Sequence, residues 1–175
     1  QTFRLAVGAF DHQDRKGTPL LRSELQRFET PEDVWRWVDS CTVKGRRTVV
    51  WAHNLAYDLR VAEAFRWLPT MGWALDMIRL DRGSAWAQWK RDGRTLSMCD
   101  TVSWFGASLE VVGKMVGIGK LELPPDDAST EAWFRRCERD VEILRAAVRR
   151  VLDWIETEDM GNWKPTGAGQ GWAAF

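Results

Sequence analysis

Apolar and polar positions follow two patterns along the chain, one typical of strands and one typical of helices. Apolar runs at 3–10 and 48–52 predict strands, and the continuous run at 48–52 is typical of a central strand covered on both faces. Residues 77–102 alternate like an antiparallel hairpin or meander, with Asp92-Gly93 as its two-residue turn. The polar stretch 11–19 predicts a loop leading to another edge strand.

Helical periodicity fills the intervals between these strands. One helix begins after Thr30-Pro31, where Thr30 can cap and proline fits the first helical position. Three further helices are predicted, at 59–68 with Pro69 closing it, from Ser108 to Gly117, and at 129–156. Strands alternating with helices predict the α/β class.

A length of 175 residues fits one domain, which we place at 1–158. Residues 159–175 are rich in glycine and are interpreted as a linker or the start of a following element. Because the chain opens with Gln rather than Met, we expect a segment before it.

Composition excludes several classes of protein. Lys plus Arg and Asp plus Glu both number 25, so the net charge does not indicate nucleic-acid binding, although a local groove can still be basic. No apolar run approaches the ~20 residues of a spanning helix. Three scattered cysteines favour neither a disulfide framework nor a zinc site. We therefore expect a soluble, cytoplasmic protein of bacterial or phage type with no membrane partner.

Candidate chemistry gathers in "AHNLAYD", residues 52–58, directly after the apolar run 48–52. Ligands of open α/β sheets bind where loops leave the carboxyl ends of strands. Asn54 and Asp58 are therefore candidate site residues. From the residues alone, Asp58 also fits a helix N-cap, Tyr57 a core position and His53 a loop position.

Three segments in order, "HNLAYD", "CDTV" and "RCERDVEIL", resemble the 3′–5′ exonuclease domain of family B DNA polymerases, most of all the protein-primed branch. The resemblance covers nearly the whole chain. The exonuclease domain that the chain resembles is a member of the DEDD superfamily. It implies a ribonuclease H-like mixed sheet flanked by helices, lacking the family's first strand. It also implies single-stranded DNA as partner and a polymerase domain in the same parent chain.

The resemblance assigns roles to individual residues. Asp58 and Asp140 match the family's metal-binding carboxylates and are the predicted catalytic residues, with Mg²⁺ or Mn²⁺ in a two-metal site. Asn54 matches the residue that fixes the frayed primer end, and Tyr57 the one that packs on sugar or base. His53 occurs in the protein-primed form of this motif.

Further nucleic-acid-binding predictions follow from shorter motifs. Thr101 and Val102 resemble a single-strand contact motif in which Val102 replaces leucine, and Lys120 with Leu123 resembles a phosphate-stabilising motif. A turn threonine and a solvated surface lysine are the alternatives. Asp100 is interpreted as structural support.

The chain departs from the family at two motifs. The third motif's tyrosine position is Arg136, and the histidine of its variant form falls on Arg135. Arg136 either forms a helix ion pair with Asp140 or holds a phosphate. No Asp-x-Glu on a suitable strand precedes Asn54, so the acidic strand either lies upstream or has been lost.

Two functions follow from these observations. The first is metal-dependent 3′–5′ hydrolysis of single-stranded DNA ends. The alternative is a catalytically incomplete module that binds single-stranded nucleic acid or a replication partner. A structural domain with coincidental motifs is the third possibility.

Overall fold

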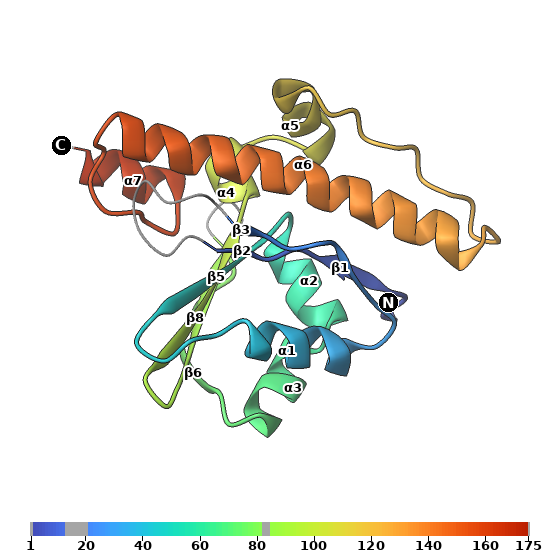
Figure 1. Ribbon diagram of the computed structural model, residues 1–175, viewed down its shortest axis with the longest axis horizontal. Coiled ribbons are helices and arrows are strands. Elements are labelled where there is room, and N and C mark those ends of the chain that lie inside the picture. Colours follow the sequence, from blue (N-terminus) through green and yellow to red (C-terminus); the bar gives the residue numbers. More distant parts are fainter. Residues whose placement is uncertain (1, 13–20, 82–84, 175) are drawn as a thin grey trace.

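The computed structural model describes residues 2–12, 21–81 and 85–174, which form a mixed α/β fold (Figure 1). The strands of this part are β1 (Ala6–Gly8), β2 (Asp11–His12), β3 (Leu21–Arg22), β4 (Gln26–Phe28), β5 (Arg47–Ala52), β6 (Ala74–Arg79), β7 (Trp86–Arg91) and β8 (Arg94–Asp100). Its helices are α1 (Pro31–Ser40), α2 (Leu55–Val61), α3 (Ala64–Thr70), α4 (Val102–Phe105), α5 (Leu109–Val116), α6 (Thr130–Thr157) and α7 (Gly167–Ala173).

The main sheet has the order β5-β8-β7-β6, in which β5 and β8 are parallel and the other pairs are antiparallel. Asp92 and Gly93 connect β7 to β8 with φ of 46° and 73°, as a tight hairpin turn requires. The predicted meander is therefore confirmed over its described residues. β1 pairs with β4 and β2 with β3 in two small sheets, and most of the predicted loop at 11–19 lies outside the described residues.

The prediction of a central strand at 48–52 is wrong in one respect. Among the described strands β5 pairs only with β8, so it lies at an edge of the main sheet. Its apolar run instead reflects cover on both faces. Val50 and Ala52 pack against the core formed with α1, α2 and α3, while the ring of Trp51 contacts Trp104 and Trp163.

The predicted helix at 59–68 is two helices. Glu63 adopts φ of 50°, a left-handed conformation that ends α2 and starts α3 in a new direction. Helix α2 begins earlier than predicted, at Leu55, because Leu55 and Leu59 both enter the core. Pro69 lies inside the last turn of α3 rather than after it.

The other helix starts are confirmed by their caps. The side chains of Thr30, Ser108 and Ser129 accept hydrogen bonds from the backbone N–H groups of Asp33, Val111 and Ala132. Gly117 ends α5 with φ of 78°. Helix α6 runs across the molecule beside α5, and Ile143 and Ala147 of α6 share a second apolar cluster with α5 (Figure 1).

The glycine-rich tail contains α7, which packs against α4. The indole N–H of Trp104 donates to the carbonyl of Pro165 at 3.0 Å. The buried amide of Gln170 donates to the carbonyl of Met160 and accepts from the N–H of Lys164. The bond from Trp104 ties the tail to the rest of the chain, and the bonds of Gln170 fold the tail back on itself.

Candidate functional site

The carboxyl ends of two parallel strands meet at one rim of the main sheet. Ala52, the last residue of β5, is paired in register with Asp100, the last residue of β8. Helix α2 follows the first strand and helix α4 the second, so both helix starts lie side by side. This is the position that the sequence predicted for Asn54 and Asp58.

Asp100 holds this rim together. Its carboxylate accepts hydrogen bonds from the backbone N–H groups of Asn54 at 3.0 Å, Leu55 at 3.2 Å and Val102 at 2.9 Å. The residue is buried, with 7% of its surface exposed. Because the two free helix starts share one carboxylate, their orphan N–H groups are satisfied. The interpretation of Asp100 as structural support is confirmed.

The structure corrects the interpretation of Thr101 as a phosphate contact. Thr101 is fully buried, and its hydroxyl donates to the carbonyl of Ala52 at 3.0 Å. The same hydroxyl lies 3.0 Å from Nδ1 of His53. Because its hydroxyl is engaged by the Ala52 carbonyl and the His53 ring, Thr101 positions that ring and has no donor left for a phosphate.

Asn54, Tyr57 and Asp58 present three different environments at the start of α2. Asn54 is exposed and occupies the N-cap with φ of 75°, but its side chain makes no capping bond. Tyr57 is 40% exposed, so its ring does not occupy a core position. Asp58 lies inside α2 and is not its N-cap.

The Asp58 carboxyl is an unusual group. Burial, together with the nearby charge of Asp100, raises its pKa to about 7. Within the described ranges the Asp58 side chain forms no hydrogen bond or ion pair. A carboxyl whose pKa is near 7 can hold or release a proton at physiological pH, whereas an ordinary aspartate stays ionised.

Arg136 and Asp140 form an ion pair one turn apart on α6. Only 9% of the Arg136 side chain and 28% of the Asp140 side chain are exposed. Nε and Nη1 of Arg136 and Oδ1 of Asp140 are buried without a hydrogen-bond partner in the described part of the chain. The pair compensates charge, but it leaves donors and an acceptor unsatisfied.

Electrostatic contacts link α6 to the rim of the sheet. Burial raises the pKa of the Cys137 thiol; the carboxylate of Asp140 raises this pKa further and the guanidinium of Arg136 lowers it, while Asp58 again raises it. Burial lowers the pKa of His53, which Asp100 raises, Lys120 lowers and Asp140 raises. Asp58 of α2 and Asp140 of α6 therefore both affect the pKa of the Cys137 thiol, so this part of α6 passes near the start of α2.

The remaining predicted residues lie around this site. Val102 is half-buried at the start of α4. Lys120 is exposed in the segment between α5 and α6, close enough to His53 to affect its pKa. Leu123, three residues on, is 74% exposed. The sequence did not predict Cys137 as a neighbour of the carboxylates, although its position between Arg136 and Asp140 on one helix gave the signal.

The described residues do not by themselves fit a two-metal centre. Such a centre needs several carboxylates free to bind cations. Asp100 is fully engaged by backbone N–H groups and Asp140 is paired with Arg136. No group of three or more His, Cys, Asp or Glu side chains within residues 2–12, 21–81 and 85–174 is arranged to hold a metal ion.

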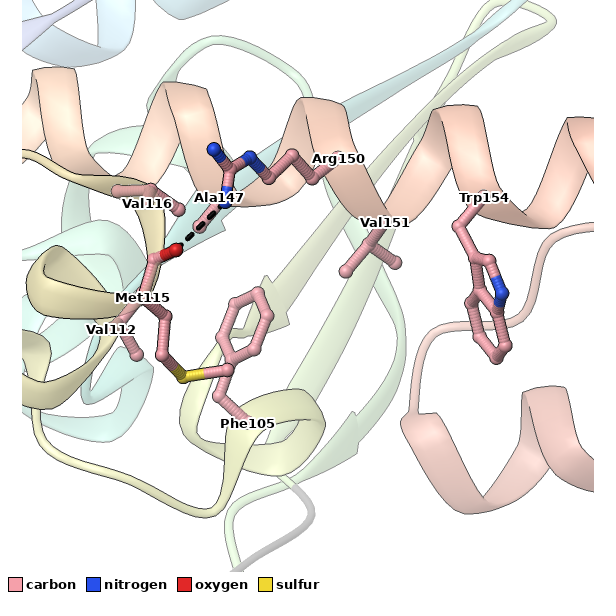
Figure 2. A pocket seen from close by; sticks show the side chains of 8 residues that line it. All are labelled: Phe105, Val112, Met115, Val116, Ala147, Arg150, Val151 and Trp154. Carbon is pink, nitrogen blue, oxygen red and sulfur yellow. Dashed lines mark hydrogen bonds between the residues drawn. The ribbon is translucent and has the colours of Figure 1, made fainter.

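A separate apolar cavity of about 210 Å³ lies between α4, α5 and α6 (Figure 2). Arg150 crosses its edge and donates to the carbonyl of Met115 at 2.7 Å. Its lining residues are Phe105, Val112, Met115, Val116, Ala147, Arg150, Val151 and Trp154. None of the predicted site residues lines this cavity, and it carries no carboxylate or nucleophile.

Comparison of the chain with protein-family models, curated proteins and solved structures finds no match. Among the described residues, no helix has the length and apolar character needed to cross a membrane. The function must therefore be argued from the geometry of the site.

Proposed function

We propose that this chain is a ribonuclease H-like domain of the 3′–5′ exonuclease type, which receives the end of a single nucleic-acid strand at the rim formed by β5 and β8. The observation that carries the proposal is that Asn54, Tyr57 and Asp58 lie at the start of α2, where the charge of Asp140 on α6 acts on the neighbouring His53. An exposed aromatic ring beside carboxylates suits a strand whose terminal base stacks while its phosphodiester faces the acidic groups.

The open edge of β5 supports the ribonuclease H-like assignment. Helix α6 packs against both β1 and β5, while each of these strands has one strand partner among the described residues. The acidic first strand implied by the resemblance would pair with the open edge of β5 and add two carboxylates beside Asp58. Hydrolysis with Mg²⁺ or Mn²⁺ requires those carboxylates, since the described residues alone do not complete the centre.

A test of hydrolysis uses 5′-labelled single-stranded DNA, Mn²⁺ and gel analysis of the products. When the acidic strand is supplied, we expect shortening from the 3′ end that Asp58→Ala abolishes and Asp153→Ala, an exposed control on α6, leaves unchanged. Degradation that survives Asp58→Ala would contradict the assignment of Asp58.

The second candidate function is strand binding without hydrolysis, which the ion pair between Arg136 and Asp140 favours because it occupies one of the two carboxylates. It predicts binding in EDTA without degradation in Mn²⁺. Tyr57→Ala should then weaken binding about 5- to 100-fold by loss of a stacked base, measured by fluorescence anisotropy. A chain that neither binds nor degrades single strands would contradict both candidates.

A further inference from the structure

The buried guanidinium of Arg136 has more donors than its surroundings satisfy. Its ion pair with Asp140 runs through Nη1 and compensates the charge, yet Nε has no hydrogen-bond partner among the described residues. Burial of unsatisfied charged donors is costly, so such groups are retained where an acceptor arrives from outside. Arginine matches the oxygen geometry of phosphate better than any other side chain.

The surroundings of Arg136 also suit an incoming anion. The charge of Asp100 is already compensated by three backbone N–H groups and that of Asp140 by Arg136 itself. Lys120 adds an exposed positive charge near His53, and no ion pair of Lys120 occurs within the described ranges. Arg136 and Lys120 therefore supply positive charge from two segments, and protonation of Asp58, whose pKa is about 7, lowers the repulsion that an anion meets.

We propose that Arg136 is the phosphate-binding residue of this site and that it binds the last internucleotide phosphate of a strand end. Asp140 holds the guanidinium in place before the strand arrives, and Lys120 lies beside the strand. This inference rests on the proposed function for the identity of the ligand. It needs no metal ion, so it can be tested in EDTA.

The first experiment alters the ligand and leaves the protein intact. Fluorescence anisotropy in EDTA compares a 5′-labelled single-stranded oligonucleotide with one whose last internucleotide phosphate is an uncharged methylphosphonate. Loss of one charge-assisted contact predicts about tenfold weaker binding for the modified strand. A methylphosphonate placed in the middle of the strand is the control and should have a smaller effect.

The second experiment alters the residue. In Arg136→Gln the two oligonucleotides should bind equally, whereas Arg136→Lys should keep part of the difference because it keeps the charge. Arg149→Gln removes the arginine of a more exposed pair with the same spacing on the same helix and should keep the full tenfold difference. Circular dichroism verifies that each variant folds.

A third measurement does not depend on strand binding. Thymidine 5′-monophosphate in EDTA should raise the Tm of the wild-type chain and of Arg149→Gln but not that of Arg136→Gln. If this holds while no oligonucleotide binds, the proposed function fails and the phosphate site stands.

Two outcomes overturn the inference. One is binding of the oligonucleotide that discriminates neither the terminal methylphosphonate nor Arg136→Gln, in which case the proposed function stands alone. The other is a wild-type chain that responds to neither thymidine 5′-monophosphate nor the oligonucleotide, which overturns both.

Discussion

Helix α6 carries two Arg–Asp pairs with the same spacing in opposite environments. The side chains of Arg136 and Asp140 are 9% and 28% exposed. Arg149 and Asp153 lie farther along the helix, where the side chains are 28% and 51% exposed and the ion pair measures 2.7 Å. Equal spacing thus yields a more exposed pair in one region and a more buried, partly satisfied pair in the other.

The sharpest way to break this comparison is to remove one carboxylate from each pair. Asp140→Ala leaves the buried Arg136 guanidinium without its ion partner and should lower the free energy of unfolding by about 3–5 kcal/mol. Asp153→Ala removes a surface pair and should change it by no more than about 1 kcal/mol. Urea denaturation followed by circular dichroism measures both. Similar losses in the two variants would show that burial does not separate the pairs.

The carboxyl of Asp58 sharpens the comparison through pH. Because burial raises its pKa to about 7, the folded chain keeps this proton between pH 4 and 7 while the unfolded chain loses it. Asp58 therefore makes the protein less stable as pH rises through this interval, and the loss in free energy of unfolding reaches its full value above pH 7. Below pH 4 both states are protonated and the cost vanishes.

Asp58→Asn should remove this pH dependence, since asparagine stays neutral. The variant should match the wild type at pH 4 and be more stable by roughly 2–4 kcal/mol at pH 8. Denaturation midpoints recorded across this pH range give the difference. A stability gain that is the same at pH 4 and pH 8 would contradict the raised pKa.

Asp100 differs from Asp58 in that its carboxylate accepts hydrogen bonds from three backbone N–H groups. Asp100→Asn places an NH₂ group against one of the three backbone N–H donors. Two donors then face each other without an acceptor, which should lower the free energy of unfolding by about 1–3 kcal/mol at pH 7. Hydrogen exchange at Leu55 and Val102 should then become faster, because their N–H groups lose part of their acceptor. Unchanged exchange at both amides would argue against Asp100 as the link between β5 and β8.

The sequence was informative where local chemistry decides the structure. Thr30, Ser108 and Ser129 were visible as caps because each side chain bonds a backbone N–H three residues away. Asp92-Gly93 was visible as a hairpin turn because few residue pairs adopt two positive φ angles. These features need no distant partner.

The sequence was less informative where distant partners decide. The position of β5 at a sheet edge follows from its pairing with β8 alone among the described strands, and a continuous apolar run carries no mark of which edge is open. Thr101 has the residue type of a phosphate contact, but β5 and β8 enclose its hydroxyl and direct it to Ala52 and His53.

The amino-acid sequence by itself therefore determined the α/β class, the capped starts of α1, α5 and α6, and the choice of Asp58 and Asp140 as candidate carboxylates. Tertiary structure alone decided that the carboxylate of Asp100 accepts hydrogen bonds from backbone N–H groups and that Asp58 is buried enough to raise its pKa. It also decided that Arg136 keeps an unsatisfied donor. The reason is physical: spacing along a helix sets which side chains can pair, whereas burial and hydrogen-bond satisfaction depend on every element that packs around them.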